Sequence, residues 1–361
     1  MQLGIVGLPF SGKSTLFQAI TRTHLDAAAA GKTDAHLGVI KVPDPRLDRC
    51  SEIFSPKSTV HATIEFVDVA GLKKGASGTA QFTTSFLGAV KNNDALIQVV
   101  RLFRNDAVPH PDGSIDPLRD IATFEAEFIL SDMAILESRI DKIRRQIGRL
   151  HDDLLKKELP VLEKCLALLE AEKPLRNEDL SPEELHILRT YQLLSLKPML
   201  IALSLDETQQ AIMDEEIGRV AAAKAALRTR VVAFFGKIDM EMSELSGEEA
   251  RMFMDEYGIR ESALDTLIRE AYALLGLQSF LTVGEDECRA WTIRTGMSAQ
   301  DAAGVIHSDF VNKFIRAEVV HYDDFIAAGG SFAKTKEAGH WRLEGKNYIV
   351  KDGDILNIRH S

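Results

Sequence analysis

The chain begins with a pattern of apolar and polar residues that predicts a strand, a loop and a helix. Residues 2–6 form a short apolar run, residues 7–12 are rich in glycine, and Leu16, Phe17 and Ile20 then follow at helical spacing. Later apolar runs predict further strands, at residues 39–42, 62–67, 95–100, 198–203 and 230–235. These runs are continuous rather than alternating, which is typical of a parallel sheet covered on both faces. We therefore expect a doubly wound, mostly parallel α/β domain.

Residues 125–196 interrupt this alternation of strands and helices. Apolar positions from Ile129 to Leu154 step by four and three residues, which is a heptad seam sustained over three repeats. Ser181 followed by Pro182 and by Glu184 predicts the start of a further helix, with a capping box. We expect a helical, coiled-coil-like hairpin inserted into the α/β domain. Packing alone explains the seam, and a partner-binding tip stays open as an addition to it.

The last 85 or so residues change character. Short strands bounded by turn residues are predicted at 288–293, 314–320, 341–343, 348–350 and 355–359, with a helix at 298–306. This mixture predicts a small α+β domain of the ubiquitin-like or β-grasp type.

Composition and charge narrow the class of protein. The 361 residues are 45% hydrophobic and 27% charged, as in ordinary soluble proteins, and no apolar run is long enough for a membrane helix. Three cysteines far apart in the sequence argue against a disulfide framework or a zinc knuckle, so we expect a cytoplasmic protein. The net charge of −11 argues against a bulk polyanion binder; we expect no DNA and no membrane partner, while RNA contact through a local patch stays open.

The glycine-rich loop carries a phosphate-binding motif. Residues 7–14 match G-x-x-x-x-G-K-[ST], in which backbone N–H groups face the phosphates. Lys13 would reach the β- and γ-phosphates, and the Ser14 hydroxyl would bind Mg²⁺. Because the motif stands between a predicted strand and a predicted helix, a fortuitous glycine-rich turn is the weaker interpretation.

A second motif ends the strand predicted at residues 62–67. Asp68 would support Mg²⁺, and Gly71 would offer a backbone N–H to the γ-phosphate. Small GTPases place a glutamine after this motif to orient the attacking water, but here the residue is Leu72. Hydrolysis is therefore slow or needs another group, for which His110 in the loop of residues 106–116 is a candidate. A lone loop histidine is more often a bystander.

These residues and others resemble the YchF/Obg-like ATPase family along essentially the whole chain. The matching stretches are residues 4–9, 12–17, 42–48, 66–72, 74–77, 114–117, 289–294, 303–307, 314–318 and 343–346. The resemblance implies a P-loop G domain (1–124 and 197–276), an inserted helical domain (125–196) and a C-terminal TGS domain (277–361). It also implies ATP in preference to GTP, Leu72 in place of the catalytic glutamine, assistance from His110, and association with ribosomes.

The motifs and the resemblance together give three sets of candidate site residues. For nucleotide binding they are Pro9, Phe10, Ser11, Gly12, Lys13, Ser14, Thr15, Ser204, Leu205, Asp206, Glu207, Gly236 and Lys237. For Mg²⁺ they are Ser14, Asp68 and Thr33, and for catalysis they are Lys13, Gly71 and His110.

The chain also departs from the family pattern. Phe10 and Ser11 replace the usual Asn-Val before the G-K-S-T residues, and Ser204 replaces the asparagine of the base-reading motif. The switch I stretch is poorly matched, so Thr33 is only the nearest candidate metal ligand. Glu207 is a base-reading candidate, although it could instead belong to a helix cap.

These departures leave three functions open. The first is an ATP-binding, slowly hydrolysing switch protein on ribosomes that regulates translation or a stress response. The second is a GTPase or an unselective NTPase of the same fold, which the Ser204 position permits. The third is a nucleotide-sensing scaffold with negligible turnover.

Overall fold

The computed structural model describes residues 1–21, 36–69, 73–74, 80–147, 153–224, 226–245, 247–257 and 262–361. These divide into two compact units, Met1–Gly38 with Glu65–Leu274 and Val39–Ile64 with Leu275–Ser361. The segment Val39–Ile64 thus belongs with the C-terminal residues, although it lies far from them in the sequence. No helix in the described part of the chain is long and apolar enough to cross a membrane.

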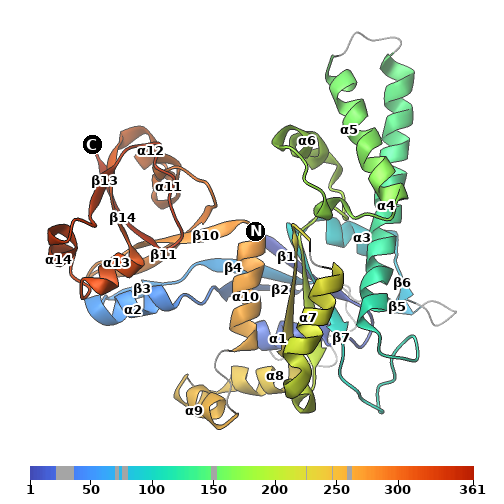
Figure 1. Cartoon of the computed structure of the whole chain (residues 1–361), viewed down its shortest axis with the longest axis horizontal. Helices are drawn as coiled ribbons and strands as arrows, with labels where there is room; N and C mark the ends of the chain where they lie inside the picture. The colour runs from blue at the N-terminus through green and yellow to red at the C-terminus, as the bar shows by residue number, and fades with distance from the viewer. Residues whose placement is uncertain are drawn as a thin grey trace. The chain divides into compact units, whose positions relative to one another are not determined.

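A six-stranded sheet organises the first unit (Figure 1). Its strands, in spatial order, are β2 (His36–Lys41), β4 (Thr63–Asp68), β1 (Gln2–Gly7), β7 (Ala95–Arg101), β8 (Met199–Leu205) and β9 (Thr229–Phe235). The pairs from β4 to β9 are all parallel, so the carboxyl ends of these strands meet at one edge of the sheet. The predicted doubly wound α/β fold is confirmed.

The central strands are buried on both faces, as their continuous apolar runs predicted. Every residue of β7 and of β8 is buried. Phe86, Phe124 and Phe128 belong to the same core cluster as residues of these strands. Helices of this unit are α1 (Lys13–Thr21), α3 (Thr84–Lys91), α7 (Met213–Lys224), α8 (Gly236–Glu244), α9 (Gly247–Tyr257) and α10 (Ala263–Leu274). The short strands β5 (Lys73–Lys74) and β6 (Ala80–Gln81) pair separately.

The expected burial is wrong for the strand at 39–42. Its counterpart β2 is the edge strand, and its residues alternate between half-buried and exposed. Val39 is 62% exposed. An edge strand has a neighbour on one side only, so fewer elements cover it.

Two long helices leave the sheet and run side by side (Figure 1). They are α4 (Pro117–Ile147) and α5 (Asp153–Glu170), followed by η1 (Leu175–Asn177), α6 (Pro182–Leu188) and η2 (Arg189–Tyr191). The first part of α4 packs on the sheet, and from Ile129 onward α4 packs in a separate cluster with α5. The predicted boundary at 124/125 therefore falls inside one continuous helix.

The heptad seam is realised on α4 but not on α5. Leu136, Ile140 and Ile143 are buried against α5, whereas Leu154 is 75% exposed and Leu155 takes the buried position. The register changes because α5 is a new helix after the connection, so the spacing counted along α4 does not continue into it. The capping box of Ser181 and Glu184 is present as predicted.

The second unit is built on a separate sheet, which has both parallel and antiparallel pairs. Its strands, in spatial order, are β13 (Arg342–Glu344), β12 (Phe314–His321), β14 (Asp354–His360), β10 (Leu277–Thr282), β11 (Glu287–Arg294) and β3 (Ser58–Val60). Its helices are α2 (Pro45–Phe54), α11 (Ala299–Ile306), α12 (Asp309–Lys313), α13 (Tyr322–Ala327) and α14 (Phe332–Glu337). The segment predicted as a strand at 348–350 forms only an isolated bridge, at Ile349.

Residues 39–64 are tied into this second unit by specific contacts. β3 pairs with β11, and Arg46 at the start of α2 forms an ion pair with Asp352 at 2.8 Å. Phe54 at the end of α2 stacks on Phe325. The three cysteines are free and buried.

Candidate nucleotide site

The loop between β1 and α1 is hydrogen-bonded to the side chain of Lys13. The Lys13 ammonium donates to the carbonyl oxygens of Gly7 and Leu8, at 2.9 and 3.0 Å. Lys13 is 9% exposed, and this burial lowers the pKa of its ammonium to about 8, against the opposing effect of Asp68. A desolvated ammonium beside the backbone N–H groups of a helix N-terminus attracts a phosphate strongly.

Two residues of this loop occupy the left-handed region of backbone conformation. Gly12 has φ of +101°, and a Cβ there would stand 2.9 Å from the Ser204 hydroxyl. Only glycine lets the loop approach Ser204 this closely. Phe10 has φ of +64° with its side chain half exposed. Asparagine, the residue expected here from the family pattern, adopts this conformation at lower cost than an aromatic residue.

A cavity of about 680 Å³ opens beside the loop. Of the predicted nucleotide-binding residues, those that line it are Phe10, Ser11, Gly12, Lys13, Ser14, Thr15, Ser204, Leu205, Asp206, Glu207, Gly236 and Lys237. Pro9 is not among the lining residues. The structure thus gathers three stretches that are far apart in the sequence around one space.

The cavity has two ends of different chemistry. We call residues 10–15 the phosphate end, because they bear Lys13 and the first turn of α1. We call residues 102–108, 204–207 and 236–240 the base end, because the base-reading candidates lie there. Glu207 and Lys237 face each other across the base end, with their charged atoms 3.8 Å apart.

Backbone hydrogen bonds tie two segments of the base end together. The carbonyl oxygen of Ser204 accepts from the N–H groups of Leu102 and Phe103, at 2.9 and 3.1 Å. The side-chain amide of Gln209 donates to the carbonyl oxygen of Leu102 at 3.1 Å. Asp206 caps η3 (Glu207–Ile212), so the expected cap is present and Glu207 lines the cavity as well.

Several lining residues were missed by the sequence analysis. They are Phe103, Arg104, Asn105, Val108 and Met240. The first four follow β7, one of the parallel strands, and ligands of such sheets bind outside the carboxyl ends of the strands. Applied to the strand predicted at 95–100, that rule could have identified the residues after it as candidates for the cavity lining.

Asp68 lies at the carboxyl end of β4, in the field of Lys13. Burial raises the pKa of its carboxyl, while Lys13 and His36 lower it. Ser14 is exposed on the cavity wall. A hydroxyl and a carboxylate are hard oxygen donors of the kind that Mg²⁺ prefers, so these residues fit that ion. Thr33, Gly71 and Leu72 lie outside the described residues.

His110 is held away from the cavity lining. Its Nδ1 accepts from the N–H of Asp112 at 3.2 Å, so its Nε2 carries the proton and donates to Asp120 at 2.9 Å. Arg119 donates to the other oxygen of Asp120. The side chain of His110 is only 5% exposed. Both ring nitrogens are therefore engaged in this conformation.

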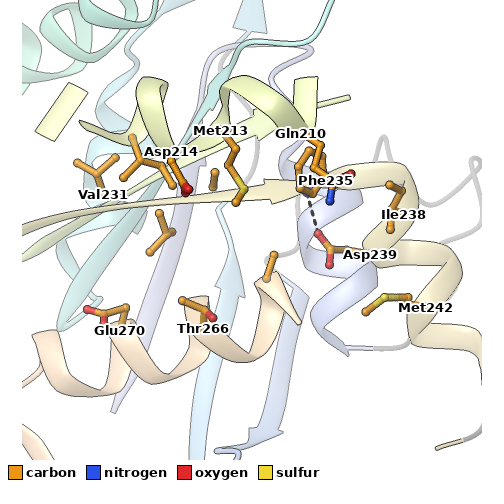
Figure 2. A pocket seen from close by; sticks show the side chains of 14 residues that line it. Gln210, Met213, Asp214, Val231, Phe235, Ile238, Asp239, Met242, Thr266 and Glu270 are labelled. Atoms are coloured by element: carbon orange, nitrogen blue, oxygen red, sulfur yellow. Dashed lines mark hydrogen bonds between the residues drawn. The ribbon is translucent and has the colours of Figure 1, made fainter. Parts of the chain in front are cut away.

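A second cavity, of about 450 Å³, lies between α7, β9, α8 and α10 (Figure 2). Helix α8 contributes to both cavities: Lys237 and Met240 line the first, and Ile238 and Met242 line the second. Asp239 accepts from the N–H of Phe235 at 2.7 Å, the bond drawn in Figure 2, and so fixes the start of α8. Burial raises the pKa of this carboxyl to about 7.

Comparisons with known proteins agree along the whole chain. A family model described as "50S ribosome-binding GTPase" matches residues 2–136, and the model of the YchF GTPase C-terminal family, described as a protein of unknown function, matches residues 277–361. The chain is 42% identical to "Ribosome-binding ATPase YchF" of Bacillus subtilis, over 99% of this chain and 98% of the relative. It is 41% identical to the protein of that name from Escherichia coli O157:H7, over 98% of both.

A solved structure extends the agreement to three dimensions. The YchF GTPase of Schizosaccharomyces pombe matches with a TM-score of 0.86 at 31% identity, over 99% of this chain and 97% of that one. A score this high over nearly the full length means that both units have counterparts there.

Proposed function

The chain belongs to the YchF family, and from this membership we propose that it is a Mg²⁺-dependent, slowly hydrolysing ATPase that acts as a ribosome-associated switch in translation or stress response. Its curated relatives are named ribosome-binding ATPases and align with it over nearly their full length. The cavity that joins the P-loop to residues 204–207 and 236–240 is the observation that carries the proposal. Ribosome association would place the protein in the cytoplasm.

At the phosphate end, we propose that charged groups and N–H dipoles bind the phosphates electrostatically. The Lys13 ammonium exchanges its bonds to Gly7 and Leu8 for the β- and γ-phosphates, and the N–H groups of the first turn of α1 add dipoles of the same sign. The Ser14 hydroxyl and the Asp68 carboxylate would hold Mg²⁺, with Thr33 as a third candidate. A bound Mg²⁺ would neutralise charge that develops on the phosphate oxygens.

For the hydrolysis step we retain His110 as the proposed catalytic group. Leu72 has no polar atom with which to orient water. His110 would have to leave Asp120 and carry its loop toward the γ-phosphate, which makes loop movement part of the cycle. The pair with Asp120 holds the histidine in one tautomer until then, and Gly71 would report the γ-phosphate through its N–H.

The proposed domain arrangement follows from the same membership. Residues 1–124 with 197–276 form the G domain, 125–196 the helical insertion and 277–361 the TGS domain. The continuity of α4 offers a rigid connection through which nucleotide-dependent movement in the G domain would reach the insertion.

Calorimetry tests nucleotide binding most directly. ATP and GTP are titrated into the same purified protein with and without Mg²⁺, and ATP should bind more tightly, with Mg²⁺ required for full affinity. Equal affinities would favour the unselective NTPase, for which the short side chain of Ser204 is the specific support. No binding of either nucleotide would refute the proposal.

Turnover and the ribosome need separate assays. A multiple-turnover phosphate-release assay should show slow ATP hydrolysis, whereas binding without release would favour the nucleotide-sensing scaffold. Cosedimentation with 70S ribosomes, with ADP or a non-hydrolysable ATP analogue present, should show binding that depends on the nucleotide. Cosedimentation that never exceeds background would remove the ribosome from the proposal.

A further inference from the structure

A buried arginine stands at the carboxyl end of β7, directly behind the base end of the cavity. Arg101 is 2% exposed. Within the described part of the chain, the acceptors of its hydrogen bonds are backbone carbonyl oxygens: Phe103 at 3.1 Å, Asn105 at 3.4 Å and Val108 at 2.8 Å. Its guanidinium carbon also lies 4.4 Å from the centroid of the Phe103 ring.

The residues that Arg101 holds are themselves the cavity wall. Phe103, Asn105 and Val108 all line the cavity, and they have no regular secondary structure of their own. The Phe103 ring reaches the phosphate end too, since one of its atoms would lie 3.9 Å from a Cβ on Gly12. One planar guanidinium with fixed donors thus sets the path of a segment from which residues 103–105 and 108 line the cavity.

The hydrogen bonds around Arg101 also reach the base-reading residues 204–207. Arg101 is paired in register with Ser204, whose carbonyl oxygen accepts from the next two N–H groups after Arg101. A shift of residues 103–108 would therefore also displace residues 204–207, to which they are bonded. Fixing such a wall in advance removes the cost of ordering it when the ligand binds.

A residue needed only for packing would not carry this charge. Among the described residues no carboxylate is bonded to Arg101, and its Nη1 has no partner there. Burying a guanidinium without a counter-charge is costly compared with an apolar side chain of similar size. Arg176, equally buried in the same unit, has the Glu125 carboxylate at 2.5 Å.

We propose that Arg101 is a positioning residue that holds residues 103–108 as the wall for the base and ribose of the nucleotide. This inference rests on the proposed function, because it assigns a part in nucleotide binding. Under this proposal, Arg101 supports the part of the ATP affinity that comes from the base and ribose. It does not contribute to binding of the phosphates.

Inorganic tripolyphosphate separates the two ends of the site. It presents the phosphates without a nucleoside, so its affinity reports the phosphate end alone. The full-length Arg101→Met, Arg101→Lys and Arg176→Met variants are titrated with ATP and with tripolyphosphate, each with Mg²⁺, and their melting temperatures are recorded. Arg176→Met is the matched control, since it also removes a buried guanidinium, but one whose hydrogen-bond partners, Thr229 and Glu125, do not line the cavity.

For Arg101→Met we expect the Kd for ATP to rise about tenfold, the scale of one lost set of positioning contacts. Its Kd for tripolyphosphate should stay within about twofold, and its kcat at saturating ATP within about threefold. Arg101→Lys keeps the charge but not the planar fork, so it should recover part of the ATP affinity. If Arg101→Met does not fold, the lysine variant decides by the same ratio of ATP to tripolyphosphate affinity.

Arg176→Met should lower the melting temperature and leave that ratio unchanged. Equal changes in ATP and tripolyphosphate affinity in the Arg101 variants, or no change in either, would overturn the inference while leaving the proposed function intact. If the wild-type protein binds tripolyphosphate but gains nothing from the nucleoside, the wall has no ligand and the inference is wrong. If the wild-type protein binds neither compound, the proposed function itself is refuted.

Discussion

The phosphate end and the base end of the cavity are built in opposite ways. The phosphate end is one continuous loop and helix start, in which Lys13 bonds to carbonyl groups five and six residues before it. The base end is assembled from three segments, and its bonds join residues about 100 positions apart, as between Gln209 and Leu102. Local chemistry defines the first and the packing of parallel strands defines the second.

This difference determines how each end responds to change. A contiguous loop keeps its shape when distant residues are altered, so its residues act almost independently of the rest of the fold. An end assembled from distant segments depends on residues that do not line the cavity, such as Gln209. The predictions below test that contrast, beginning with the largest expected effect.

Removing the lysine of the phosphate end should have the largest effect. We expect Lys13→Ala to weaken ATP and tripolyphosphate alike by about 1,000-fold, or about 4 kcal/mol, because a buried ammonium that would contact two phosphates is lost. Calorimetry on both ligands measures this. Lys237→Ala, at the base end and 70% exposed, is the control and should leave tripolyphosphate binding unchanged. A folded Lys13→Ala protein with wild-type affinity would sink the P-loop assignment.

The next effect concerns turnover rather than binding. His110→Ala should lower kcat about 100-fold with little change in ATP affinity, the usual loss for a positioned acid or base. Leu72→Ala is the comparison and should change kcat much less, since leucine transfers no proton. Single-turnover and steady-state assays with and without ribosomes measure both. If His110→Ala turns over like the wild type, the histidine serves only its contact with Asp120.

A third prediction concerns the stability of the helix that carries part of the base end. The folded protein holds the proton of Asp239 up to a pH of about 7, whereas the unfolded chain releases it near pH 4. The unfolded state therefore binds fewer protons between these values, and stability falls as the pH rises from about 4 to about 7. Asp239→Asn keeps an acceptor for the Phe235 N–H without the buried charge.

Urea unfolding at a series of pH values measures this effect. Asp239→Asn should be about 2 kcal/mol more stable than the wild type at pH 8, with a smaller difference at pH 5. Asp214→Asn, which also lines the second cavity, is the control. Parallel pH curves for Asp239→Asn and the wild type would contradict the prediction.

The smallest effect is expected for base selectivity. Ser204 offers one hydroxyl where an asparagine offers an amide, so we expect the preference for ATP over GTP to stay below about 1,000-fold, or about 4 kcal/mol. Ser204→Asn should raise that preference by up to about tenfold and leave tripolyphosphate binding unchanged. Competition between ATP and GTP measures it. An unchanged preference in Ser204→Asn would show that the position does not read the base.

The sequence by itself determined the phosphate end and the type of fold. Glycine, lysine and serine at fixed spacing between a strand and a helix specify a phosphate loop, because every contact they need is local. The continuous apolar runs at 95–100 and 198–203 likewise specified central parallel strands, and β7 and β8 are buried along their full length. Local spacing was a poor guide on the edge strand, as at Val39, and where a new helix changes the register, as at Leu154.

The tertiary structure decided that residues 102–108 join the base end, and it decided the partners of the charged groups. Nothing in the spacing of residues 102–108 reveals that they form a wall, since their conformation comes from the Arg101 guanidinium and the Ser204 carbonyl. The pairing of His110 with Asp120, and the place of Val39–Ile64 in the second unit, are contacts between residues that the sequence does not align by any period. Sequence periodicity records which side of an element is buried, but it does not record which distant group meets it there.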